Sequence, residues 1–293
     1  MKLTDDMVIF GNRAICRSYA KINLTLDVLG KLENGYHELE SVMQSVNLFD
    51  LVIVDKTPKG IQVSTNLKYL PNNEKNIAYQ AAKLFFEVTG IRGGAKILIR
   101  KNIPVAAGLA GGSGNAAAVL AALNQLFCAP LSQRELFTVS KRLGADVPFC
   151  LMCGTQLTTG IGDVMKPIRP FPKKLILLVK PPVNIPTADI YRKLDSVLIP
   201  PHPKTADFIS ALECGNMEQV YASMFNVMEA VTEKEHPVIS GIKEKLRRNG
   251  AKAAMMSGSG STVFGLFDDY KKAFRSQESF SRMYQEVYLT HTN

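Results

Sequence analysis

Residues 103–118 read IPVAAGLAGGSGNAAA, a stretch that combines glycines with other small residues. Gly108, Gly111 and Gly112 punctuate a turn that leads into a run of small residues ending at Leu126, which predicts a helix. Before the turn, residues 95–101 roughly alternate apolar and polar side chains, as a strand does. A glycine-rich turn that opens a helix presents unpaired backbone N–H groups, with the positive end of the helix dipole behind them. The stretch therefore suits the binding of phosphate.

The spacing of these glycines differs from that of the common nucleotide-binding motifs. No lysine follows them as in GxxxxGK[ST], and GxGxxG is not matched. An ordinary glycine-rich turn between a strand and a helix is therefore the alternative to phosphate binding. The pattern PxxxGLxGGS, from Pro104 to Ser113, is longer and more specific than a lone glycine pair.

Composition predicts an ordinary globular protein of two domains. The chain has 293 residues, of which 46% are hydrophobic and 21% charged, and single cores commonly stop growing near this size. We expect an N-terminal domain over 1–155 and a C-terminal domain over 156–293. No apolar run approaches the roughly 18 residues of a membrane span, and residues 1–6 lack the apolar segment of a signal peptide. We therefore expect a cytoplasmic protein without membrane contact, either a monomer or a homodimer.

The net charge of +9 does not indicate a nucleic-acid binder. Lysine and arginine are dispersed along the chain, whereas nucleic-acid binding favours basic residues clustered with aromatic ones. A field that attracts an anionic small substrate explains the charge as well, and so does a merely basic surface.

The five cysteines do not form a disulfide framework, because their number is odd and they are scattered. Cys150 and Cys153 have C-x-x-C spacing, which is also that of a redox pair or of half a zinc site. No second C-x-x-C and no H-x-x-x-H partner is present. Since the pair lies in an apolar run and free cysteine packs as a small hydrophobe, we expect buried, inert thiols.

Helices and strands mix along the chain without a strict βαβ rhythm, which favours an α+β fold. Alternating or short apolar runs predict strands at 14–28, 40–55, 60–65, 95–101, 173–180, 253–256, 262–267 and 285–289. Helical spacing and end signals predict helices at 76–90, 111–126, 132–143, 188–194, 205–214, 216–225, 235–249 and 270–280.

Polar residues in three places are candidates for chemistry. Lys21 and Asn23 share one face of a predicted strand, the glycine loop suits phosphate, and Asp146 is expected in a turn between a helix and an apolar segment. Phosphoryl transfer needs phosphate positioning, charge neutralisation and a group that orients or deprotonates the attacking hydroxyl. Singly, Lys21 also fits a solvated strand face and Asp146 an ordinary turn residue.

The chain resembles the GHMP kinases, the family of galactokinase, homoserine kinase, mevalonate kinase and phosphomevalonate kinase. The family's central motif PxxxGLGGSS is close to residues 104–114, and its glycine-rich third motif is matched by MSGSGS at 256–261. Further matching segments are SYAKINL at 18–24, NGYH at 34–37 and GADVPF at 144–149. These ordered segments span nearly the whole chain, from about residue 14 to residue 267.

The resemblance implies a two-domain architecture with the active site in the cleft between the domains. It implies ATP-dependent phosphorylation of the 2-hydroxyl of a cytidine-diphosphate-linked methylerythritol, with ATP as co-substrate and Mg²⁺ accompanying the triphosphate. Asp146 is then the base and Lys21 the cation that keeps it ionised, which agrees with electrostatics because an opposite charge within about 4–6 Å favours the carboxylate.

The resemblance also assigns binding residues. Asn23 is expected near the reacting hydroxyl, and Tyr36 and His37 are expected to grip the cytosine, since an aromatic ring stacks on a base and an imidazole can bind its polar edge. Tyr191 is the candidate for a second aromatic, with Thr187 as a polar contact, although core packing explains Tyr191 nearly as well. Without the family, His37 is a turn residue with a solvated ring. The residues expected to bind ATP are Pro104, Ala107, Gly108, Leu109, Ala110, Gly111, Gly112, Ser113 and Gly114, with Ser113 also a candidate magnesium ligand.

Two positions depart from the family pattern. Ala110 adds a methyl group where the loop must be tight, and we expect its φ to be negative. Gly114 replaces the second serine of GGSS, which keeps a backbone N–H donor but removes a hydroxyl near the phosphates. The alternatives are therefore a sibling GHMP kinase acting on mevalonate, homoserine or a sugar, and a catalytically weakened relative that binds a nucleotide or metabolite.

Overall fold

The computed structural model describes residues 3–33, 35–199 and 201–293, and the chain forms two compact units. The first unit consists of residues 1–20, 48–105 and 110–153. The second consists of residues 21–47, 106–109 and 154–293. Two long strands, β2 (Arg13–Lys31) and β3 (His37–Thr57), are shared by both units. Division of the chain at residue 155 stays a prediction.

In the first unit, β2 and β3 lie in one sheet with several shorter strands. β1 (Val8–Phe10) is antiparallel to β2, and β5 (Gly94–Arg100) is antiparallel to β3. β4 (Gly60–Thr65) completes the order β1-β2-β3-β5-β4 by pairing in parallel with β5. Within β5 the alternation expected from the sequence is present, since Ile97 and Ile99 are buried whereas Lys96 and Arg100 are exposed.

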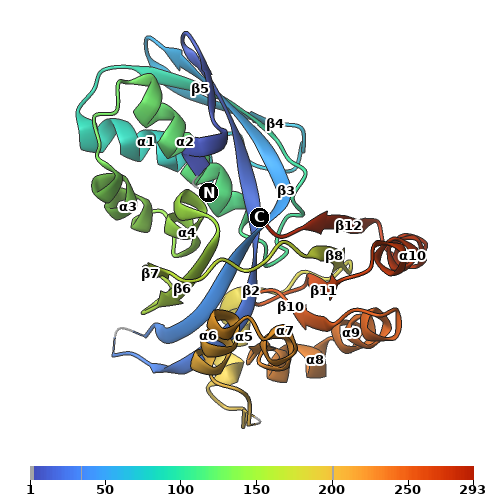
Figure 1. Ribbon diagram of the computed structural model, residues 1–293. Helices are drawn as coiled ribbons and strands as arrows, with labels where there is room; N and C mark the ends of the chain where they lie inside the picture. Colours follow the sequence, from blue (N-terminus) through green and yellow to red (C-terminus); the bar gives the residue numbers. More distant parts are fainter. Residues whose placement is uncertain (1–2, 34, 200) are drawn as a thin grey trace. The chain divides into compact units, whose positions relative to one another are not determined.

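The α-helices of the first unit lie together, as Figure 1 shows. They are α1 (Ile77–Thr89), α2 (Gly111–Leu126), α3 (Gln133–Lys141) and α4 (Asp146–Met152), and a short 3₁₀ turn, η1 (Leu3–Asp6), precedes β1. Helix α2 packs against both α1 and α4. Its side chains from Ala116 to Leu123 are all buried, because small residues let helices approach closely on several sides.

The helix expected over 76–90 is confirmed with its caps, whereas the helix expected over 132–143 ends at Lys141. Asn76 caps α1 by accepting from the N–H of Ala78, and Gly90 ends it in the left-handed conformation. Ser132 and Glu135 form a capping box at the start of α3. The expectation that Asp146 lies in a turn is wrong, because Asp146 is the first residue of α4. An acidic residue in a first helical turn is favoured by the helix dipole.

The second unit combines the other halves of β2 and β3 with a separate four-stranded sheet. β3 pairs with β6 (Thr155–Thr159), which pairs with β7 (Val164–Pro167), and β2 pairs with the two-residue strand β9 (Phe225–Asn226). The separate sheet is antiparallel in the order β10-β11-β8-β12. Its strands are β8 (Leu175–Lys180), β10 (Ala253–Met256), β11 (Val263–Phe267) and β12 (Glu286–His291).

The helices of the second unit are α5 (Thr187–Leu194), α6 (Thr205–Cys214), α7 (Met217–Ala222), α8 (Glu229–Glu235), α9 (Val238–Arg248) and α10 (Tyr270–Ser281). Helix α9 packs on β10 and β11, and α10 packs on β8 and β12. Their apolar faces contribute to one core, in which Ile239, Ile242, Leu246 and Phe280 are at most 2% exposed.

Two predicted helices of this unit end earlier or begin later than expected. The helix predicted over 216–225 stops at Ala222, and Phe225 belongs to β9. The helix predicted over 235–249 begins only at Val238, while Glu235 ends the unpredicted helix α8. Pro237 explains this break, because a proline disfavours helical geometry in the residue before it. Asn34, the first residue of the NGYH segment, lies outside the described residues.

The expectation of buried thiols is confirmed for Cys150 and Cys153. Burial raises the pKa of Cys153 to about 12, so its thiolate is scarce at neutral pH. The structure contains no membrane-crossing candidate among its described helices, since none combines the needed length and apolar character.

Candidate active site

The first turn of α2 is the structural form of the predicted phosphate loop. Ala110 is the N-cap residue of α2, and no side chain of the described residues caps the first turn of this helix. The first N–H groups of an α-helix have no partner within the helix, and they carry its positive partial charge. Gly112 is exposed and Ser113 is half-buried at this end. The turn therefore offers backbone donors and one hydroxyl to an anion.

The backbone of the loop contradicts one expectation. Ala110 has φ 55° and ψ 28°, in the left-handed region, instead of the negative φ that we expected. Ala106 also has a positive φ, of 52°, and Gly108 between them has φ 71°. The left-handed conformation costs a residue with a Cβ about 1–2 kcal/mol. Two alanines adopt the left-handed conformation within five residues. These alternating left-handed residues fold the backbone tightly into the start of α2. Such strain is concentrated at functional sites.

Gly114 lies on the buried face of α2. A Cβ at this position would meet the Ser18 hydroxyl oxygen at 2.5 Å, inside the first unit. The same hydroxyl accepts a hydrogen bond from Asn115 Nδ2 at 3.3 Å. A serine at position 114 would therefore direct its side chain toward Ser18 and not toward the exposed side that Gly112 occupies. The missing second serine is accounted for by interior packing.

Asp50 anchors the chain that leads into this loop. Its buried carboxylate accepts from the backbone N–H groups of Asn102 at 2.7 Å and Ile103 at 2.8 Å, and from Asn115 Nδ2 at 2.8 Å. Lys101 forms an ion pair with the same carboxylate. These bonds join the residues before Pro104 to the first turns of α2. Asp50 was not predicted, although an acidic residue within the apolar run 46–54 signals a buried polar contact.

In the second unit, the loop segment 106–109 lies against the glycine-rich segment 256–261. The Ser257 hydroxyl donates to the carbonyl oxygen of Gly108 at 3.0 Å. A Cβ added to Gly108 would overlap the carbonyl oxygen of Ser257. Glycine is therefore required at position 108 both for its positive φ and for this close approach. The central and third motifs are brought together in the fold.

Lys21 is held beside the same two segments. Its backbone N–H donates to Leu109 O at 3.1 Å, and a Cβ on Gly258 would lie 3.5 Å from its Nζ. The side chain is 4% exposed, so the solvated strand face is excluded for Lys21. Nζ donates to Asn23 Oδ1 at 2.8 Å, and Asn23 Nδ2 donates to the Ser41 hydroxyl at 2.8 Å. The predicted shared face of Lys21 and Asn23 is therefore a fixed polar contact.

Helix α5 connects the third motif with the residues expected to bind cytosine. At its first residue, the Thr187 hydroxyl lies 2.7 Å from the Ser259 hydroxyl. One turn later, Tyr191 stacks on His37 with ring centroids 5.0 Å apart and planes 20° apart. Four residues advance a helix by about 6 Å. Tyr191 also packs against the core of the second unit, as the alternative expectation had it, and its role as a second aromatic for cytosine stays a prediction.

A carboxylate that was not predicted orients His37. His37 Nε2 lies 2.6 Å from Asp195 Oδ1, and Lys31 Nζ lies 2.8 Å from Asp195 Oδ2. His37 and then Lys31 hold the pKa of Asp195 below its usual range, so the carboxylate is ionised and accepts from Nε2–H. The spacing of Tyr191 and Asp195, one helical turn apart, was the available signal. Tyr36, next to His37, is 62% exposed.

The remaining predicted residues divide between the units. Asp146, Pro104, Ser113 and the start of α2 belong to the first unit, whereas Lys21 and the residues of the expected cytosine site belong to the second. Asp146 is half-buried. The pairing of Asp146 with Lys21 stays a prediction. Within the described residues no three His, Cys, Asp or Glu side chains are grouped as a metal site.

Comparison with known proteins assigns the family. The family model for the GHMP kinases N terminal domain matches residues 76–154, and that for the GHMP kinases C terminal matches residues 208–286. A homoserine kinase from Cytophaga hutchinsonii shares the fold, with a TM-score of 0.76 at 18% identity over 98% of this chain and 96% of its own. The chain belongs to the GHMP kinase family.

Within this family, the chain is similar to proteins named 4-diphosphocytidyl-2-C-methyl-D-erythritol kinase. The one from Clostridium botulinum (strain Alaska E43 / Type E3) is 46% identical over 94% of this chain and 99% of its own length. The one from Clostridium novyi (strain NT) is 45% identical over the same shares. A crystal structure of 4-(cytidine 5'-diphospho)-2C-methyl-D-erythritol kinase has a TM-score of 0.81 at 31% identity, covering 95% of this chain and 99% of that one.

We predict that Gly108→Ala disrupts the phosphate loop. The new methyl group overlaps Ser257 O, so the backbone must shift by about 1 Å. A misplacement of about 1 Å in an active site can lower the rate about 10²-fold. Calorimetric titration with an ATP analogue should show weakened binding, and kinase assays should show the loss in rate.

Gly241→Ala is the matched control for this substitution, because a Cβ there meets nothing within 4 Å. In the interior of α9 it should stabilise the protein by about 0.5–1 kcal/mol. Wild-type nucleotide affinity in Gly108→Ala would contradict the proposed close approach.

We predict that Gly114→Ser destabilises the first unit although it restores the family pattern. Forcing a side chain against Ser18 should cost about 1–3 kcal/mol, as overpacking does, measured as the free energy of unfolding in urea. Adding Ser18→Ala should recover part of that loss, because the Ser18 hydroxyl is the group in the way. Equal stability of Gly114→Ser with and without Ser18→Ala would contradict this packing account.

Proposed function

We propose that this protein is an ATP-dependent kinase that phosphorylates the 2-hydroxyl of 4-diphosphocytidyl-2-C-methyl-D-erythritol. The observation that carries the proposal is its 46% identity, over 94% of the chain, with a relative named for that activity. The reaction belongs to the non-mevalonate route to isoprenoid precursors. We further propose that it takes place in the cytoplasm.

The ATP phosphates are held by backbone donors between Gly108 and Ser113. Support comes from the uncapped first turn of α2 and from the exposure of Gly112. Mg²⁺ bound with the triphosphate would neutralise the charge that develops during transfer. The Ser113 hydroxyl is the ligand that we propose, because magnesium prefers oxygen and usually takes few ligands from the protein itself.

Asp146 is the proposed general base, and Lys21 is the cation that acts with it. Asp146 takes the proton of the 2-hydroxyl, the oxygen attacks the γ-phosphorus, and the bond from that phosphorus to the bridging oxygen breaks to release ADP. Lys21 fits this role because a buried ammonium group requires anionic partners. Its Nζ also donates to the neutral oxygen of Asn23. The Asp146 carboxylate and the transferred phosphoryl group are the anions that we propose it acts on during the reaction.

Cytosine recognition is proposed for Tyr36, His37 and Tyr191, with Thr187 as a polar contact nearer the phosphates. Support comes from helix α5, which places Tyr191 against His37 and Thr187 against Ser259. A nucleoside diphosphate needs its base and its phosphates bound a short distance apart, which one turn of helix provides. Asp195 supports the same role by fixing the hydrogen of His37 on Nε2.

We predict that Asp146→Asn abolishes phosphoryl transfer while nucleotide binding persists. Loss of a general base typically costs about 10²–10⁴-fold in rate, and asparagine preserves the size of the side chain at the start of α4. The measurement is ADP release with the cytidine-diphosphate-linked substrate, together with calorimetric titration of an ATP analogue.

Wild-type protein is the reference for both measurements with Asp146→Asn. A folded wild-type protein without turnover on this substrate would refute the proposed function. Substantial turnover by Asp146→Asn would remove Asp146 from the role of base while leaving the substrate assignment intact.

We predict that Tyr36→Ala and His37→Ala raise the KM for the cytidine-linked substrate and leave the KM for ATP within about twofold. Stacking of a base on an aromatic side chain contributes about 1–3 kcal/mol, which corresponds to roughly 5- to 150-fold in KM. Steady-state kinetics with each substrate varied in turn provides the test.

Tyr69→Ala is the matched control for Tyr36, because Tyr69 is a similarly exposed tyrosine, at 72%, and belongs to the first unit. It should leave both KM values unchanged. Substrates of the sibling kinases lack cytosine, so unchanged kinetics in the Tyr36 and His37 variants would favour a sibling activity instead.

A further inference from the structure

We propose that Asn226 and Glu229 are positioning residues for phosphoryl transfer. They hold the start of the glycine-rich segment 256–261 so that Ser257 contacts Gly108 and Gly258 lies beside Lys21. This inference rests on the proposed function, because that function is what gives Gly108 and Lys21 their tasks. All of these residues belong to the second unit.

Asn226 uses both of its amide atoms on backbone groups, and it is 5% exposed. Its Nδ2 donates to Met256 O at 2.9 Å and to Gly258 O at 2.8 Å. Its Oδ1 accepts from Met228 N at 3.0 Å. Because an amide NH₂ has two hydrogens, these bonds use its full donor capacity. Asn226 therefore bridges two carbonyls of the glycine-rich segment with one rigid group.

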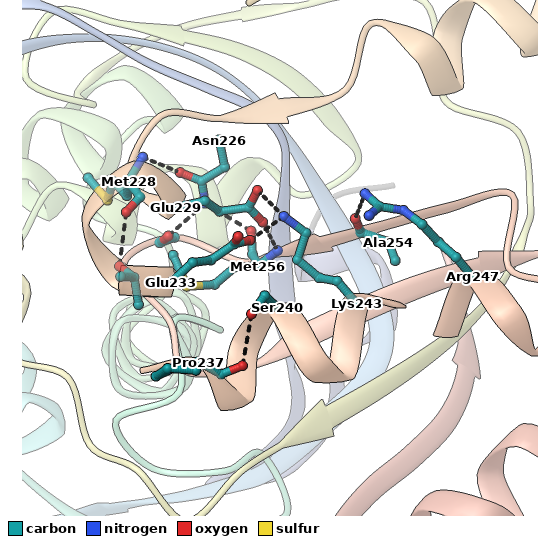
Figure 2. Close-up of polar contacts among 12 residues, drawn as sticks. Asn226, Met228, Glu229, Glu233, Pro237, Ser240, Lys243, Arg247, Ala254 and Met256 are labelled. Atoms are coloured by element: carbon teal, nitrogen blue, oxygen red, sulfur yellow. Dashed lines mark hydrogen bonds and ion pairs between the residues drawn. The ribbon is translucent and has the colours of Figure 1, made fainter. Parts of the chain in front are cut away.

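Glu229 holds the other side of Met256. Its Oε1 accepts from Met256 N at 2.7 Å, and its Oε2 lies 2.5 Å from Lys243 Nζ. Lys243 also forms an ion pair with Glu233. Figure 2 shows Asn226 and Glu229 converging on Met256, with Lys243 between the two glutamates. The N–H and the C=O of one residue are thus bound by two side chains.

The position of Met256 explains why side chains are needed there. Met256 is the last residue of β10, which lies at the edge of the four-stranded sheet. On the side away from β11, backbone groups of an edge strand have no neighbouring strand to bond. Buried backbone groups must be hydrogen-bonded, so Asn226 and Glu229 replace the absent strand at this point. A backbone edge held in this way cannot shift without leaving polar groups unpaired.

The contacts that Asn226 makes extend from the edge of the sheet into the candidate site. Asn226 binds Gly258 O, and Gly258 is the residue whose Cβ would lie 3.5 Å from Lys21 Nζ. Between the two carbonyls that Asn226 binds lies Ser257, whose hydroxyl donates to Gly108 O. Satisfying the backbone groups of Met256 at the sheet edge would need only the contacts to Met256. The additional bond to Gly258 makes the geometry of Lys21 and Gly108 depend on Asn226 and Glu229.

The test compares Glu229→Ala with Glu233→Ala. Glu229 and Glu233 both lie in α8, and each variant removes one carboxylate that pairs with Lys243. Only Glu229 also binds the backbone of Met256. We expect Glu229→Ala to lower kcat/KM for ATP at least 10-fold, with the KM for the second substrate within twofold. Glu233→Ala should retain wild-type values. Rates are measured at least 15 °C below the Tm of each variant, so that a difference in folded fraction does not enter.

Glu229→Gln provides the rescue. Its amide oxygen can accept from Met256 N although the charge is gone, so it should recover most of the activity that Glu229→Ala loses. Asn226→Asp should lose activity as Glu229→Ala does, because a carboxylate then faces two carbonyl oxygens. Where Glu229→Ala does not fold, Glu229→Asp and Glu233→Asp replace the pair, since aspartate shortens the reach to Met256 by one methylene group.

Two results would overturn the proposal: Glu229→Ala with the ATP kinetics of Glu233→Ala, or Glu229→Gln as impaired as Glu229→Ala. Calorimetric titration of an ATP analogue separates this failure from failure of the proposed function. A wild-type protein that binds the analogue but does not phosphorylate the cytidine-linked substrate refutes the function alone. In that case, equal analogue affinity in the Glu229→Ala and Glu233→Ala variants still refutes the positioning role.

Discussion

The contact between Gly108 and the backbone of Ser257 is the constraint on which the candidate site depends. There is room for a hydrogen atom at Gly108 and not for a methyl group. The hydrogen bond from Ser257 to Gly108 O forms across the same approach. Two segments about 150 residues apart in the sequence are thereby fixed against each other, and the backbone of Lys21 is bonded to the next residue, Leu109.

In each unit, a carboxylate that is paired with a lysine holds backbone groups of the candidate site. In the first unit, the Asp50 carboxylate accepts hydrogen bonds from the backbone of residues 102 and 103 and from Asn115 of α2. In the second, Glu229 binds Met256 at the start of the third motif. Asp50 is fully buried with Lys101, whereas Glu229 is half-buried beside Lys243. Removing one partner of a buried pair typically costs about 3–5 kcal/mol, so the Asp50 anchor resists displacement.

The sequence predicted most of the elements and the identity of the motifs, because both are local. Caps, the glycine that ends α1 and the strand alternation in β5 depend on residues close together in the chain. Asp195, Asn226 and Glu229 were missed because their partners are distant in sequence or are backbone groups that carry no side-chain signal. The φ of Ala110 was predicted wrongly because the argument considered only the intrinsic cost of a Cβ, and the fold imposes a larger demand.

Two alanines in left-handed positions suggest how the loop is kept rigid. Glycine at residues 106 and 110 would relieve the folded state of about 1–2 kcal/mol of strain each. It would also widen the conformational freedom of the unfolded chain, which costs about 0.4–1 kcal/mol at each position. The net penalty of each alanine is therefore small. In return, alanine has fewer alternative conformations than glycine, so the backbone donors that we propose for the ATP phosphates would lose less ordering entropy on binding.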